Sequence, residues 1–132
     1  MNQISSDEWL SKADEDLLTA KILLSVAESP NRSIAFSSQQ SIEKSLKAFL
    51  SSVPEFRIPK SHDLGLLVKF CKDKDLDFSG LNMEKLIGLS YFAVEARYPG
   101  NPDSVTRDEA NESFHFAKRI REIVQNALKQ AE

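Results

Sequence analysis

The chain has 132 residues, a formal net charge of −3 and a pI of about 5.5. This length suffices for one hydrophobic core, so we expect a single domain over residues 1–132. Its 41% hydrophobic and 28% charged residues exclude a disordered chain. The acidic pI argues against a dedicated DNA-binding protein. The single cysteine, Cys71, excludes an internal disulfide bond and a cysteine-based zinc site.

No sign of export or membrane insertion is present in the sequence. Residues 1–12 lack a basic stretch followed by an apolar run, so we expect no signal peptide. No apolar stretch approaches the roughly 20 residues that a membrane span requires. We therefore expect a cytoplasmic protein that does not bind membranes, with no metal site and no cofactor.

A capping signal and a proline mark the ends of the first predicted helix, residues 7–28. Ser5 and Glu8 are spaced as a capping box, in which the hydroxyl accepts from a backbone N–H and the carboxylate reaches back. Pro30 ends the helix, because proline disfavours helical backbone at the residue before it. The apolar residues recur every three or four positions on one stripe, made by Trp9, Ala13, Leu17, Ala20, Leu24 and Ala27.

Three further helices are predicted in the middle of the chain. The second helix spans residues 33–52, and the two prolines that follow it indicate a loop over 53–61. The third helix is short and spans residues 63–74. The fourth spans residues 82–97, with Asn82 as its expected cap.

The final helix is predicted to start at a second capping box, Thr106 with Glu109, and to run towards the end of the chain. No alternating strand pattern competes with these helices. The predicted fold class is all-α: an antiparallel up-and-down bundle of four long helices plus one short helix.

Four polar side chains on the second helix are the first candidate site residues. Gln40, Glu43, Lys44 and Lys47 follow the spacing i, i+3, i+4 and i+7, so they share one face beside the apolar stripe. Such a face can line a cleft or meet another chain; alternatively, Glu43 and Lys47 form an ordinary solvated i,i+4 pair. Residues 32–60 carry 5 basic and 2 acidic side chains, which suits an anionic partner such as a nucleotide or an RNA end.

Two further segments supply candidates for binding a partner or ligand. His62 precedes the third helix, where it either caps or packs, or joins an anion cleft with Lys44, Lys47, Lys60 and Arg97. Arg97 closes the fourth helix and is followed by Tyr98. An arginine there complements the helix dipole, but its planar fork also fits a phosphate.

Several blocks of the sequence, in order, resemble the HEPN domain family. The resemblance covers residues 9–128 and rests on four runs, SIAFSSQQSIEKSLKAFL, KSHDLGLLVKF, ARYPG and TRDEANESFHFAKRI. It implies a helical bundle that forms homodimers. It also implies a separate minimal nucleotidyltransferase chain as partner, in a pair of the toxin–antitoxin type. Some members of the family are metal-independent ribonucleases.

The ribonuclease members carry an arginine followed, after four to six residues, by a histidine near the start of the last long helix. These two groups supply a base for the 2′-hydroxyl and a cation for the developing charge. Here Arg97 has no such histidine, and seven residues separate Arg107 from His115. Phe114 and Phe116 flank His115, so we expect a partly buried packing histidine.

The sequence therefore predicts a non-catalytic HEPN module that dimerises and binds a minimal nucleotidyltransferase, a nucleotide or both. The alternative is a metal-independent endoribonuclease toxin with a degenerate motif. Its candidate catalytic residues are Arg107 and His115.

Overall fold

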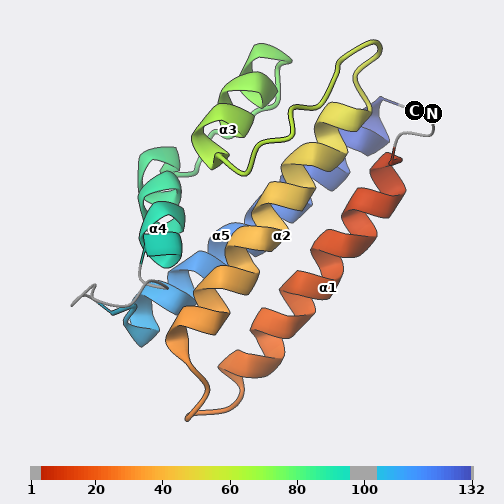
Figure 1. The fold of residues 1–132 in the computed structure, drawn as a ribbon. Helices are drawn as coiled ribbons and strands as arrows, with labels where there is room; N and C mark the ends of the chain where they lie inside the picture. Colours follow the sequence, from red (N-terminus) through yellow and green to blue (C-terminus); the bar gives the residue numbers. More distant parts are fainter. Residues whose placement is uncertain (1–3, 96–103, 132) are drawn as a thin grey trace.

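The computed structural model describes residues 4–95 and 104–131, and only the backbone of residues 92–95 (Figure 1). Within these residues the chain forms helices and no strand. The helices are α1 (Ser6–Leu24), α2 (Asn31–Ser51), α3 (Leu64–Asp73), α4 (Met83–Glu95) and α5 (Arg107–Gln130). The predicted all-helical bundle is confirmed.

The starts of three helices lie where the capping signals predict. The Ser5 hydroxyl accepts from the Glu8 backbone N–H, and Thr106 caps α5 in the same way, with both capping boxes complete. Asn82 accepts from the backbone N–H of Lys85 at the start of α4. These side chains bind backbone N–H groups that the first turn of a helix leaves without a partner.

The connection between α1 and α2 differs from the prediction. Helix α1 ends at Leu24 rather than at residue 28, and in the turn that follows the hydroxyls of Ser25 and Ser29 donate to the carbonyls of Ile22 and Val26. Helix α2 begins at Asn31 rather than at residue 33, with Pro30 as its N-cap. Proline is tolerated at this place, since the first N–H groups of a helix have no intrahelical partner.

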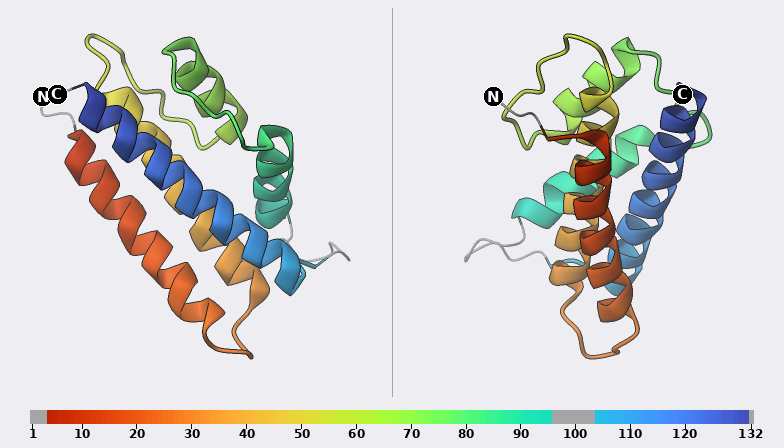
Figure 2. Two further views of the ribbon diagram at one scale, coloured as in Figure 1. Left: turned by 180° about the vertical axis from the view of Figure 1, so that it is seen from behind. Right: turned by 90° about the vertical axis from the view of Figure 1, so that its right-hand side faces the viewer.

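Helix α2 is the centre of the bundle, because it packs against each of the other four helices. Helix α1 runs antiparallel to α2 on one side of it. Helices α3 and α4 carry the chain back, so that α5 runs in the same direction as α2 (Figures 1 and 2). A helix covered on so many sides exposes only a narrow strip to water. Gln40 and Lys44 are half-buried on this helix, whereas Glu43 and Lys47 are buried.

Small residues set the spacing between α1 and α2. Ala13 is fully buried, and Ser41 donates from its hydroxyl to the Ala13 carbonyl at 2.9 Å. Large aliphatic side chains such as Leu46 and Ile120 fill the main core on the other sides of α2. The close approach of α1 to α2 brings charged side chains of the two helices into contact along their shared edge.

None of the helices in residues 4–95 and 104–131 combines the length and the apolar character needed to cross a membrane.

Candidate functional site

Glu43, on α2, is a carboxylate inside the protein. Its side chain is only 3% exposed, and it accepts a hydrogen bond from Lys47 Nζ at 3.2 Å. On its other side lies His62 Nδ1, at 3.1 Å from Oε1 and 3.0 Å from Oε2. His62 itself is 81% exposed. The three side chains therefore form a line from the interior to the surface.

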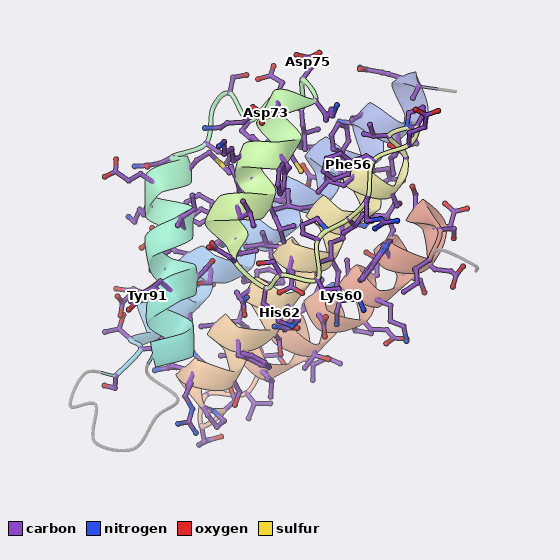
Figure 3. The ribbon with its side chains drawn as sticks, turned by 45° about the horizontal axis from the view of Figure 1, so that its top comes forward. Phe56, Lys60, His62, Asp73, Asp75 and Tyr91 are labelled. Atoms are coloured by element: carbon purple, nitrogen blue, oxygen red, sulfur yellow. The ribbon has the colours of Figure 1, made fainter. Side chains whose placement is uncertain are left out.

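The connection between α2 and α3 brings His62 to this place. Figure 3 shows His62 and Lys60 on this connection, where it passes over α2. Asp63 starts α3 by accepting from the Leu66 backbone N–H, so the residue before it is held at the helix start. His62 is thus not the cap of α3, and its ring is available to contact Glu43.

Lys47 is held between a carboxylate and an aromatic ring. Its side chain is 8% exposed, and Nζ lies 5.4 Å from the centroid of the Trp9 ring on α1. A buried ammonium group requires such partners, because its desolvation costs several kcal/mol. The indole Nε1 of Trp9 is buried and has no hydrogen-bond partner among the described residues.

The other two polar residues of the predicted face have different partners. Lys44 Nζ lies 2.5 Å from Asp16 Oδ2, which joins α2 to α1 in a half-buried ion pair. Gln40 donates to the neighbouring side chain of Gln39 at 3.2 Å. The face is therefore continuous along α2, but only Glu43 and Lys47 of its four residues interact with each other.

A shallow groove of about 380 Å³ continues the same edge of α2 towards its N-terminus. Residues of both α1 and α2 line it: Thr19, Leu23, Arg32, Ser33, Phe36 and Ser37. Ser33 and Ser37 lie on the helical face of Gln40 and Lys44, since their spacing is close to whole turns. The polar face and the groove thus form one strip between α1 and the rest of the bundle.

Arg107 has a structural environment at the start of α5. Its guanidinium donates to the backbone carbonyls of Val26 at 2.7 Å and Ser29 at 3.3 Å, and to the Asn31 side chain at 3.0 Å. A guanidinium beside the last carbonyls of a helix is favourable, because the helix dipole is negative there. These bonds occupy the donors that a phosphate would need.

His115 lies on the outside of α5, and the expectation of a partly buried packing histidine is wrong. The side chain is exposed, and its ring makes only an edge-to-face contact with Phe114, at 5.7 Å between centroids. The helix turns adjacent residues about 100° apart, so the flanking phenylalanines and His115 do not share a face. No described contact joins His115 to Arg107.

The structure brings together three of the predicted site residues, Glu43, Lys47 and His62. Arg97 and Tyr98 lie outside the described residues. Sequence reasoning missed Trp9 as part of the site, because a tryptophan on the apolar stripe reads as core. No group of three or more His, Cys, Asp or Glu side chains in the described part of the chain is arranged to hold a metal ion.

The described residues define a helical bundle whose central helix, α2, carries a buried ion pair. The histidine His62 connects this pair to the surface. The family model of the HEPN domain matches residues 6–127 of this sequence. The chain belongs to the HEPN domain family.

Two solved structures share this fold. The protein TT1696 from Thermus thermophilus superimposes with a TM-score of 0.64 at 21% identity, over 94% of this chain and 98% of that one. ST0689, described as an archaeal HEPN homologue, gives a TM-score of 0.64 at 19% identity, over 96% and 98%. Among curated proteins, no relative matches this sequence.

Proposed function

We propose that this chain is a non-catalytic HEPN module that forms a homodimer and binds a separate minimal nucleotidyltransferase through the polar face of α2. The same face would contact that enzyme's nucleotide or an RNA end, in a pair of the toxin–antitoxin type. The observation that carries this proposal is the buried ion pair of Glu43 and Lys47.

A buried ion pair is weak evidence for a stabilising role. Replacing a buried ion pair by apolar residues of similar volume is often neutral or stabilising, because two charges no longer have to be desolvated. For the stability of a central helix, leucine and methionine at these two positions would serve as well as the two charged side chains. The exposed side chain of His62 joins the pair to the surface, which supports a role in binding a second molecule.

The charges around the pair favour an anionic ligand. Lys60 is exposed on the same connection as His62, and Lys44, one position after Glu43 on α2, is about one-quarter exposed. Residues 32–60 have an excess of three basic side chains in a chain that is acidic as a whole. A local excess of positive charge attracts phosphate groups.

An apolar stripe on α1 supports the homodimer. Leu18 and Ile22 are each 55% exposed, and Val26 beyond the helix end is 45% exposed. Residues four positions apart lie on one helix face, so Leu18 and Ile22 form an exposed apolar stripe on α1. A two-fold axis would place this stripe against its own copy.

The ribonuclease alternative has less support from the same structure. A metal-independent ribonuclease needs a base and a cation at one phosphate. Arg107 is engaged with carbonyl groups, and His115 lies about two helical turns along α5 from it. An RNA cleavage assay on the wild type and on His115→Ala tests this alternative: cleavage that disappears in the variant would establish it.

Isothermal titration with ATP and co-purification with a co-expressed minimal nucleotidyltransferase test the main proposal. The informative variant is Glu43→Leu with Lys47→Met, which removes the charges but keeps the volume. It should fold, as judged by circular dichroism, and lose most of the binding. The matched control is Arg119→Leu with Glu122→Met, an exposed ion pair on α5. Equal binding by the two double variants would refute the proposal.

A further inference from the structure

The hydrogen bond between His62 and Glu43 determines which ring nitrogen faces the solvent. An ionised carboxylate has only acceptors, and Glu43 already accepts a hydrogen bond from Lys47 Nζ at 3.2 Å. The Nδ1 atom of His62, 3.0 Å from Glu43 Oε2, therefore carries the hydrogen in this contact. The other ring nitrogen, Nε2, has no partner among the described residues, and the side chain is 81% exposed.

Protonation changes what this open nitrogen can bind. In the neutral ring Nε2 is an acceptor and offers a lone pair to the solvent. In the imidazolium form it becomes a charged N–H donor, and a charge-assisted bond to a phosphate oxygen is roughly twice as strong as a neutral one. Glu43 and Lys47 already neutralise each other. The local cluster thus carries a net positive charge only when His62 is protonated.

No neighbouring side chain provides the same change of charge as His62. Besides Glu43, the charged side chains of the surrounding elements are Arg32, Lys44 and Lys47 of α2, Glu55, Arg57, Lys60 and Asp63 of the connection, and Asp7, Glu8, Lys12, Asp14, Glu15, Asp16 and Lys21 of α1. Asp16 is paired with Lys44, and Asp63 caps α3. None of these residue types has an ordinary charge change between pH 5 and 8, which is the range of histidine.

We propose that His62 Nε2 binds a terminal phosphate group, and that this binding is coupled to the uptake of one proton by His62, with Glu43 as its positioning residue. The inference rests on the proposed function only in that the α2 face is the binding surface. The phosphate belongs to a nucleotide or to the 5′ end of an RNA, and these two sources offer the same chemistry.

Isothermal titration of ATP into the full chain at pH 6, 7 and 8, at constant ionic strength, tests the coupling. Because the phosphates of ATP also titrate in this range, the quantity compared is the difference between the wild type and His62→Gln. Each titration is repeated in two buffers of different ionisation enthalpy, which gives the number of protons taken up.

The wild type should bind about tenfold or more weakly at pH 8 than at pH 6, relative to His62→Gln, because histidine as a residue type ordinarily changes its charge between pH 5 and 8. The wild type should also take up as much as one proton more per ATP than the variant. His115→Gln is the matched control, because His115 is the other histidine and is exposed on α5. It should keep the pH dependence of the wild type.

A separate readout reports the role of Glu43. Long-range ¹H–¹⁵N spectra of the wild type at pH 8 should show neutral His62 with its hydrogen on Nδ1. The double variant Glu43→Leu with Lys47→Met should lose this preference. An Nε2-protonated ring in the wild type would overturn the inference, whatever the binding data show.

The outcomes separate this inference from the proposed function. Equal pH dependence in the wild type and His62→Gln, with ATP still bound, refutes the proton coupling and leaves the binding module intact. No binding of ATP or of 5′-phosphorylated RNA at any pH refutes the phosphate site, and co-purification with the nucleotidyltransferase then decides the proposed function separately. Comparing the binding of a 5′-phosphorylated oligonucleotide with that of its 5′-hydroxyl counterpart identifies the source of the phosphate. A pH-dependent preference for the phosphorylated form assigns the site to RNA ends.

Discussion

Arg107, at the start of α5, donates to the backbone carbonyl of Val26, beyond the end of α1, at 2.7 Å. The same guanidinium reaches Ser29 and Asn31, so one side chain holds the α1–α2 connection against α5. This contact assigns to Arg107 a structural role that the sequence does not indicate.

Replacing Arg107 by methionine should lower the free energy of unfolding by about 1–3 kcal/mol, because charge-assisted bonds to carbonyl groups are lost. His115→Gln should change it by no more than about 0.5 kcal/mol, since that side chain is exposed. Urea denaturation followed by the fluorescence of Trp9, the single tryptophan, measures both. Similar losses in the two variants would show that Arg107 does not stabilise the connection.

Removing one partner of the buried ion pair should be costly. Glu43→Gln leaves the ammonium of Lys47 buried without its counter-charge, and we expect a loss of about 3–5 kcal/mol. The double variant Glu43→Leu with Lys47→Met should be about as stable as the wild type. Urea denaturation of the three proteins gives the comparison, and a double variant as unstable as Glu43→Gln would mean that the charges themselves stabilise the fold.

The thiol of Cys71 should be inert in the folded protein. Burial raises the pKa of Cys71 from 9.0 to about 12, so at pH 8 the group stays protonated and a poor nucleophile. A chromogenic disulfide reagent at pH 8 should react with it only at the rate of unfolding, and at once in concentrated guanidinium. Fast labelling of the native protein would contradict the burial of this residue.

Enlarging a side chain between α1 and α2 should strain the bundle. Ala13 is fully buried where the two helices approach, so Ala13→Leu has no space for its extra atoms. We expect a loss of about 1–3 kcal/mol. The control is Lys12→Leu, which introduces the same residue type at an exposed neighbouring position. Equal stability of the two variants would show that the contact between α1 and α2 at Ala13 is loosely packed.

The apolar stripe of α1 should control the oligomeric state. Ile22→Lys places a charge in the proposed dimer contact and should shift the protein from dimer to monomer in light scattering. Asn126→Lys, on the exposed side of α5, adds the same charge elsewhere and should leave the mass unchanged. A monomeric wild type, or a dimer that Ile22→Lys does not affect, would exclude this contact.

Much of the fold follows from local signals in the sequence. The capping boxes at Ser5 and Thr106 fix two helix starts, because they involve only residues three positions apart. The end of α1 is less predictable. It depends in part on Arg107, which lies far along the chain and reaches the turn only in the folded bundle.

The candidate site is predictable in part for the same reason. Helical spacing alone puts Glu43 and Lys47 within reach of each other, and the structure shows this pair. The partners of His62 and Lys44 come from other elements, so no local pattern reveals them. Trp9 follows the period of the apolar stripe, which conceals its contact with Lys47.

Helix α2 is clamped by every other helix, which limits how a bound molecule can influence this protein. Helix α2 packs against several helices, so it cannot bend or shift without displacing them. A ligand bound at its exposed strip therefore has little effect on the position of α2. The irregular connection that carries His62 is joined to α2 at that strip by the bond to Glu43. A conformational change that a ligand transmits to a partner would therefore involve this connection and not α2.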